Sequence, residues 1–170
     1  MVVKLLGRKW TMRFDGLAII ASNDIRIMLS CEDGGTMPFS FKLEFPCSNN
    51  AVEYEAYLTG LVIALSMEIK HIRVLGDSNL VFSQVKGDFA LKEPSLASYR
   101  TWAQKMKRRF QTFSVKYAQR SENRFTDALA NVGSQVPFEK ESTLVRVNKQ
   151  QNSITETLKK MFPEQPNEED

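Results

Sequence analysis

The chain has 170 residues, of which 42% are hydrophobic and 25% charged, and a formal net charge of +3, which suits one globular domain with room for a tail. Its apolar runs fall short of the roughly 20 residues that span a bilayer, and its N-terminal apolar segment is too short for a secretory signal, so we expect no membrane contact. Because Cys31 and Cys47 have no metal-ligand or disulfide-framework spacing, we expect free thiols in an intracellular, reducing compartment.

The modest net charge is unevenly distributed. Residues 105–109 (KMKRR) are strongly basic, whereas residues 164–170 are acidic and contain proline. A folded part that is more basic than the whole chain suits contact with phosphates. A solvated helix face explains the basic stretch equally well.

The first half of the chain predicts three strands followed by a long helix. Apolar and polar residues alternate over residues 10–15, 25–31 and 39–45, which is typical of half-buried strands. Residues 32–35 (EDGG) have the composition of a hairpin turn between the second and third strands. Residues 50–68 then show helical periodicity.

The second half predicts alternating strands and helices. The predicted elements are a strand at 71–76, helices at 79–85 and 95–110, a strand at 113–117 and a helix at 123–131. An antiparallel meander that leads into β-α-β crossovers predicts an α/β fold, with a five-stranded mixed sheet and helices on both of its faces.

Domain boundaries follow from where the periodicity begins and ends. We expect an N-terminal extension at residues 1–9, a folded domain at 10–134, and a polar linker or tail at 135–170. The last segment is rich in Gln, Asn, Glu, Lys and Pro, and we expect one short helix in it near residues 154–161.

Four carboxylates stand at the ends of these predicted elements: Asp15, Glu53, Asp77 and Asp127. Adjacent strand ends in such a sheet open onto one crevice, where four acids repel one another unless cations lie between them. Oxygen ligands without a His or Cys partner favour Mg²⁺ or Mn²⁺. The pattern is that of a two-metal site for phosphodiester hydrolysis, which needs no nucleophilic side chain.

Each acid also has a purely structural interpretation. Asp15 precedes a glycine and suits a turn, and Glu53 stands three residues after Asn50, as in a capping box. Asp77 suits a helix N-cap, and Asp127 suits the first turn of a helix. Taken singly, each structural interpretation is the better one; four acids on one topology favour a shared site.

Four sequence blocks occur in a specific order: WTMRFDG at residues 10–16, SNNAVEYEA at 48–56, GDSNLV at 76–81 and DALA at 127–130. Together they resemble the type 1 ribonuclease H domain, in the version found in plant Ty3/gypsy-type retrotransposon polyproteins. The resemblance covers residues 10–134 and implies a ribonuclease H-like fold.

The resemblance implies a metal-dependent endoribonuclease that hydrolyses the RNA strand of RNA–DNA hybrids with two Mg²⁺ ions, or Mn²⁺ in their place. It implies catalytic, metal-binding roles for Asp15, Glu53, Asp77 and Asp127. It also implies substrate-binding roles for Asn49, Asn50 and Ser78. The implied partners are the hybrid and a reverse transcriptase or retroelement polyprotein, and we expect a monomer.

Three positions depart from the family pattern. Leu17 replaces a small or hydroxyl residue, Arg26 stands about where glycine is common, and Tyr117 replaces a histidine. One alternative is therefore a catalytically impaired module that binds nucleic acid without cutting it, because the altered loop at 17–26 prevents productive docking. Another is a structural or interaction module.

Overall fold

The structure is a computed structural model that describes residues 7–18, 23–76, 96–117 and 148–163. These residues form six strands and three helices. In chain order they are β1 (Lys9–Ala18), β2 (Asn23–Cys31), β3 (Thr36–Leu43), α2 (Asn49–Ser66), β4 (His71–Gly76), α4 (Ala97–Lys107), β5 (Thr112–Tyr117), β6 (Asn148–Gln150) and α7 (Ile154–Met161).

The strands form one mixed sheet in the order β5-β4-β1-β2-β3-β6. β1, β2 and β3 are an antiparallel meander, β4 and β5 run parallel to β1, and β6 runs parallel to β3. The predicted mixed sheet is confirmed, with β6 as a strand beyond the five predicted. β4 has the predicted bounds, and the hairpin turn is confirmed by Gly34, whose φ of 105° suits glycine.

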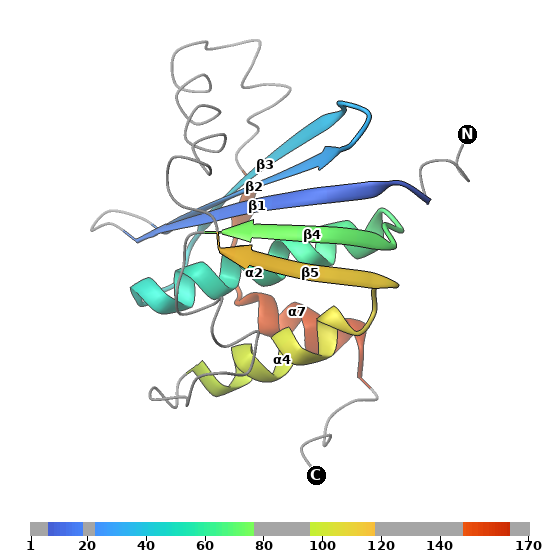
Figure 1. Ribbon diagram of the computed structural model, residues 1–170. Coiled ribbons are helices and arrows are strands. Elements are labelled where there is room, and N and C mark those ends of the chain that lie inside the picture. The colour runs from blue at the N-terminus through green and yellow to red at the C-terminus, as the bar shows by residue number, and fades with distance from the viewer. Residues whose placement is uncertain (1–6, 19–22, 77–95, 118–147, 164–170) are drawn as a thin grey trace, which may run out of the picture.

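The described helices all cover one face of this sheet (Figure 1). α2 packs on β1 and β2, and α4 and α7 pack against α2. The helices predicted at 79–85 and 123–131, and with them the prediction of helices on both faces, lie outside the described residues. The helix predicted at 95–110 is confirmed as the shorter α4.

Strand alternation decides which side chains meet the helices. On β1, Trp10, Met12 and Phe14 point into the core and are at most 5% exposed, whereas Thr11 and Arg13 point the other way. Sites in register on β2 and β4 repeat this division, so one face of the sheet is apolar and covered. Trp102 on α4 and Tyr54 and Tyr57 on α2 also join the core.

The C-terminal part of the chain differs from the predicted tail. Residues 148–150 pair with β3, and α7 buries Ile154 and Leu158 against the other helices. The structure therefore places residues 148–163 within the fold rather than in a linker, and it confirms the short helix at the predicted bounds. Two apolar residues one turn apart suffice to dock a short helix, but they are too few to outweigh a polar composition in the sequence.

A buried carboxylate joins α7 to the rest of the domain. Glu55 of α2 is fully buried and accepts hydrogen bonds from the Tyr99 hydroxyl at 2.6 Å, the Ser153 hydroxyl at 2.5 Å and the Ile154 backbone N–H at 2.9 Å. Ser153 is also the N-cap of α7, and its Oγ accepts from the N–H of Thr155. The carboxylate of Glu55 thus accepts three hydrogen bonds, and those from Ser153 and Ile154 hold the first turn of α7 to α2.

Truncation of a buried α7 side chain tests whether this segment belongs to the domain. Leu158→Ala is expected to lower the free energy of unfolding by about 2–5 kcal/mol, because Leu158 is fully buried and its removal leaves a cavity. Urea denaturation measures the change. Thr157→Ala, on the exposed side of the same helix, is the control, and equal stability of the two variants would contradict the packing described.

The Glu55 network predicts a pH dependence. Burial raises the pKa of Glu55 above its ordinary 4.5, although the three hydrogen bonds oppose the shift. A carboxyl with a raised folded pKa contributes stability that is fully present below the unfolded pKa and is lost as pH rises through the folded pKa. We expect the stability of the wild type relative to Glu55→Gln to fall as pH rises above 4.5. Denaturation of both proteins across this range measures it; a flat or rising difference would rule out the raised pKa.

Candidate active site

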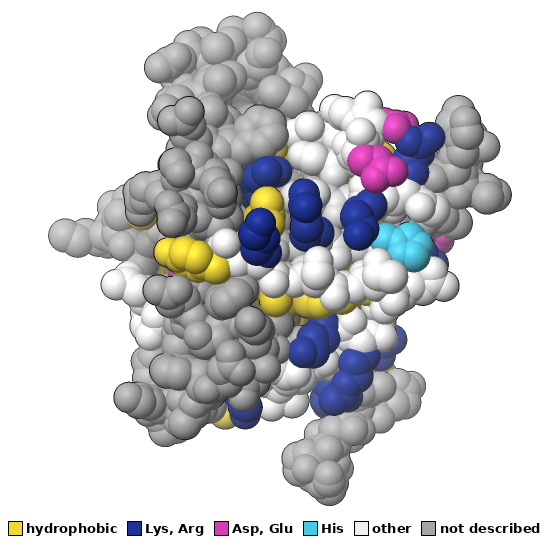
Figure 2. Space-filling model, viewed as in Figure 1, with side chains coloured by type: hydrophobic (Ala, Val, Ile, Leu, Met, Phe, Trp, Pro, Cys, Tyr) yellow, Lys and Arg dark blue, Asp and Glu magenta, His cyan; other side chains and the backbone are white. Residues whose placement is uncertain are grey.

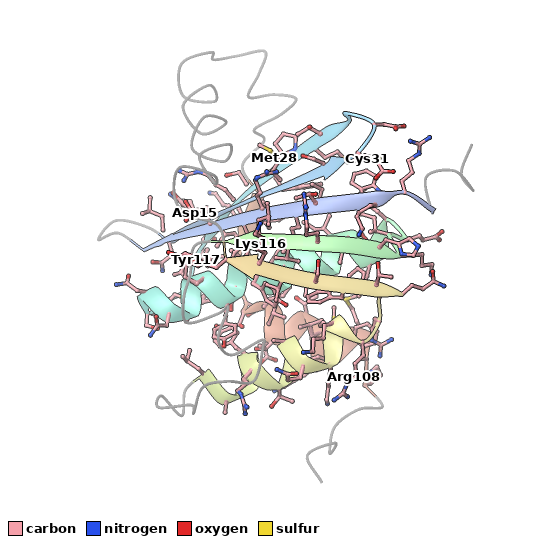
Figure 3. All side chains as sticks on the ribbon, viewed as in Figure 1. Asp15, Met28, Cys31, Arg108, Lys116 and Tyr117 are labelled. Carbon is pink, nitrogen blue, oxygen red and sulfur yellow. The ribbon has the colours of Figure 1, made fainter. Side chains whose placement is uncertain are left out.

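Asp15 lies within β1, near the end of the sheet where β4 and β5 also terminate (Figure 3). It is half-buried and stands directly opposite Arg26 of β2. Because β1 continues through Leu17 to Ala18, paired with β2 throughout, Asp15 is not a turn residue, and that structural interpretation is wrong. The same pairing places Arg26 in a strand rather than in the connecting loop.

Glu53 lies on α2, one residue later in the helix than predicted. The helix begins at Asn49, and its N-cap is Ser48, whose Oγ accepts from the N–H of Ala51 at 3.1 Å. Glu53 is therefore beyond the first turn, and a capping box with Asn50 is ruled out, since Asn50 lies inside the helix. Glu53 remains half-buried near the N-terminal end of α2 with no capping duty.

A direct contact between β1 and α2 brings the neighbourhoods of these two acids together. A Cβ on Gly16 would lie 2.5 Å from Val52 Cγ1 and 2.7 Å from the Val52 carbonyl oxygen. Only glycine fits there, so the residue after Asp15 touches the residue before Glu53. Sequence reasoning treated Gly16 as a turn signal and missed this packing role; a glycine that continues a strand pattern is the available signal.

The other predicted site residues, Asp77, Ser78 and Asp127, lie outside the described residues. Gly76, the last residue of β4, pairs with Tyr117 of β5, and a Cβ on it would lie 2.6 Å from the Phe14 ring. β4, which leads to Asp77, runs parallel beside β1.

Asn49 and Asn50 occupy the first two positions of α2 and are exposed. The backbone N–H groups of a helix's first turn lack partners within the helix, and its dipole favours anions at that end. Asn49 and Asn50, the predicted substrate-binding asparagines, therefore lie at the end of α2 where the helix dipole favours an anion.

The donor chemistry of the site fits a hard divalent cation. Asp15 and Glu53 supply carboxylate oxygens from two elements in contact, the ligand type that Mg²⁺ prefers. Over the described ranges, no three His, Cys, Asp or Glu side chains converge into a metal site; two of the four predicted ligands are not among those residues.

Alternative nucleophiles in the described part are poorly placed. His71 begins β4, at the strand end away from Gly76, and its Nδ1 lies 2.9 Å from Thr112 Oγ1. Burial, and secondarily the charge of Glu55, raises the pKa of the Cys47 thiol to about 12, which keeps it protonated at neutral pH. Both observations agree with a site that works through carboxylates.

The fold is that of ribonuclease H. The crystal structure of ribonuclease H1 from the halophilic archaeon Halobacterium salinarum aligns with a TM-score of 0.66 at 28% identity, covering 73% of this chain and 96% of that one. LC11 ribonuclease H1, solved in complex with an RNA/DNA hybrid, has the same fold, with a TM-score of 0.62 at 23% identity over 71% of this chain and 92% of that one.

The sequence places the chain more narrowly. The model of the family described as reverse transcriptase-like matches residues 2–133, and the chain belongs to this family. Ribonuclease HI of Halobacterium salinarum is 31% identical over 99 residues, 58% of this chain and 50% of that protein. A bifunctional protein of Mycobacterium tuberculosis is 32% identical over 84 residues, 49% of this chain and 23% of that protein. The matched part of the chain spans half or less of these curated relatives.

Gly16→Ala tests the contact that positions the site. We expect a loss of about 1–3 kcal/mol in the free energy of unfolding, because the added methyl meets backbone as well as side-chain atoms of Val52. Gly35→Ala is the matched control, since a Cβ there meets nothing within 4 Å. Thermal and urea unfolding compare the two; equal effects would contradict the close approach of β1 and α2.

Proposed function

We propose that this domain is a metal-dependent endoribonuclease that hydrolyses the RNA strand of RNA–DNA hybrids. The observation that carries the proposal is the pair of half-buried carboxylates, Asp15 and Glu53, each of which stands next in sequence to a residue of the Gly16–Val52 contact between β1 and α2 in a ribonuclease H fold. Neither acid has the structural role that the sequence offered as its alternative. Membership in the reverse transcriptase-like family and the likeness to ribonucleases H1 support the same reaction.

In the proposed mechanism, Asp15 and Glu53, together with Asp77 and Asp127, would hold two Mg²⁺ ions, for which Mn²⁺ is an alternative. Bound there, such ions would supply the positive charge that activates a water and stabilises the leaving oxygen of a phosphodiester. The protein's own contribution is to fix the carboxylates on two packed elements. The close β1–α2 contact limits their movement relative to each other.

Substrate contacts are proposed for Asn49, Asn50 and Ser78. The first two lie exposed at the N-terminus of α2, where the helix dipole favours a phosphate. Contacts to phosphate and sugar carry no sequence information, so we expect little base specificity. Choice of the RNA strand rests on its 2′-hydroxyls and on the shape of the hybrid's groove.

We also propose a retroelement origin of the plant Ty3/gypsy type, with a reverse transcriptase or polyprotein as partner and the domain itself monomeric. The four sequence blocks support this origin. The free thiols of Cys31 and Cys47 suit an intracellular, reducing compartment. None of the described helices is long and apolar enough to cross a membrane.

A second candidate is a module that binds the hybrid without cutting it. The observation that favours it is Arg26, which stands directly opposite Asp15 in the strand register and brings a fixed positive charge to the place where a cation is needed. Leu17, also on β1, is 40% exposed where the family carries a small or hydroxyl residue.

Asp15→Asn is expected to abolish cleavage while leaving the fold intact. A lost metal ligand removes several kcal/mol of transition-state stabilisation, or about a thousandfold or more in rate. The assay is cleavage of a labelled RNA–DNA hybrid with Mg²⁺, with Mn²⁺ and with EDTA, beside single-stranded and duplex RNA. Asp24→Asn, in the neighbouring strand β2, is the control. Turnover retained in Asp15→Asn would sink the two-metal mechanism.

The same assay separates the two candidates. If the folded wild type binds the hybrid but does not cut it, the binding module is favoured, and Arg26→Gly combined with Leu17→Ser is then expected to restore cutting. Metal-dependent cutting by the wild type rejects that candidate.

A further inference from the structure

The C-terminal ends of two helices meet on one side of the domain. The ring of Phe162, which directly follows α7, lies 6.2 Å from the ring of Trp102 on α4, centroid to centroid. The Arg109 guanidinium lies 3.8 Å from the centroid of the same Phe162 ring. On α4, the Nζ of Lys105 lies 5.0 Å from the centroid of the Trp102 ring. These ring contacts hold the last turn of α4 and the end of α7 together.

Lysine and arginine are concentrated at these two helix ends. The last turns of both helices are basic, and the helix-end cluster consists of Lys105, Lys107, Arg108, Arg109, Lys159 and Lys160. The sole acid in the sequence of residues 96–117 and 148–163 is Glu156, whose Oε2 lies 3.8 Å from the Nζ of Lys159. Figure 2 shows blue side chains over the end of α4, with no magenta side chain beside them among the described residues.

Compensation of the helix dipoles does not account for so many cations. The C-terminal end of a helix carries about half a negative charge, so about one cation balances two such ends. Arg108, Arg109 and Lys160 are exposed, and 62% of the Lys159 side chain is accessible. Most of the charge of the cluster therefore faces solvent, as a positive surface that attracts anions.

The surface is hollowed beside the cluster. Lys107 and Arg108, together with Phe110 and Phe113, line a hollow of about 410 Å³. The hollow is larger than a single carboxylate or phosphate needs, and its wall is partly aromatic. Ion pairs made in a hollow are screened less by salt than pairs on a flat surface. The cluster therefore suits a chain that carries several negative charges.

The protein itself supplies an acidic segment next to this cluster. Residues 164–170 (EQPNEED) hold four acids, Glu164, Glu168, Glu169 and Asp170, and neither Lys nor Arg. Phe162, two residues before the segment, is the residue whose ring contacts Arg109. Fully extended, seven residues span up to about 25 Å, whereas the 11 residues of α4 extend over about 16 Å. The segment is therefore long enough to reach every cation of the cluster.

Covalent attachment favours this segment over a free partner. Single ion pairs at a protein surface are weak, but a segment attached beside its binding surface has an effective concentration of millimolar order. A segment that binds with a Kd of about 1 mM then occupies the cluster about half of the time. Contact of that strength is measurable and is sensitive to salt.

We propose that the acidic segment 164–170 docks on the helix-end cluster and competes with other polyanions for it. Figure 3 shows Arg108 on the other side of the molecule from Asp15. The proposed contact is thus separate from the candidate active site, and it does not rest on the proposed function.

The test compares the wild type with a variant whose segment is neutral at unchanged length: Glu164→Gln, Glu168→Gln, Glu169→Gln and Asp170→Asn combined. NMR measures the backbone amide shifts of residues 105–109, which are far from the segment in sequence. The two salt conditions are about 0.01 M, where the Debye length is about 30 Å, and about 1 M, where it is about 3 Å. We expect these amide shifts to differ between the two proteins at low salt and to coincide at high salt.

A double-mutant cycle assigns the effect to the cluster. In the background of Arg108→Gln with Lys160→Gln, neutralising the segment is expected to shift the 105–109 amides by less than half as much. The control background, Lys9→Gln with Lys149→Gln, removes the same charge from exposed positions on β1 and β6 and is expected to retain the full effect.

An equal effect in both backgrounds would overturn the proposal, and so would an effect that persists at about 1 M salt. It is also overturned if the 105–109 amides ignore the segment and shift only on addition of a polyanion. A shift with the RNA–DNA hybrid in EDTA would then assign the cluster to nucleic acid, and a shift with polyglutamate would assign it to an acidic partner protein. Because none of these readouts needs turnover, failure of the cleavage assay leaves this test unaffected.

Discussion

The close approach of α2 to β1 is the constraint on which the domain depends. Two glycines permit it, one on each element: Gly16 meets Val52, and a Cβ on Gly60 would lie 2.5 Å from Met12 Sδ. The helix therefore lies against β1 at two points, near its N-terminal end at Val52 and past its middle at Gly60, with no intervening side chain at either glycine. The position of Glu53 relative to Asp15 is a consequence of this packing rather than of any bond between the two acids.

A helix that lies so deep needs cover on its other side. α4 and α7 provide it, which explains why α2 is apolar around most of its circumference rather than along one stripe. The exception on that side is Glu55, whose burial is tolerated because three donors from Tyr99, Ser153 and Ile154 surround its carboxylate. The C-terminal segment thus completes the environment of the helix that carries Glu53.

The sequence predicted those features that depend on local pattern. Residues 71–76 became β4 without change, and α7 also has its predicted bounds. The first residue of α2 was harder to predict from the sequence. Ser48 and Asn50 are both good N-cap residues, and only the fold selects between them. β6 was missed since Asn-Lys-Gln has no strand propensity; its three residues are extended because they pair with the edge of β3.

In the candidate site, too, some features follow from the local sequence pattern and others depend on which strands and helices pair. Carboxylates at element ends were visible in the sequence, whereas the Gly16–Val52 contact and the pairing of Asp15 with Arg26 required the register.

The placement of Arg13, Arg73 and Lys116 on one face of the sheet also required the register, because these residues come from three strands far apart in the sequence. Once α2 covers one face of the sheet, the alternate residues of β1 are left on the other. Arg13 and Asp15 therefore share the face of β1 that α2 does not cover.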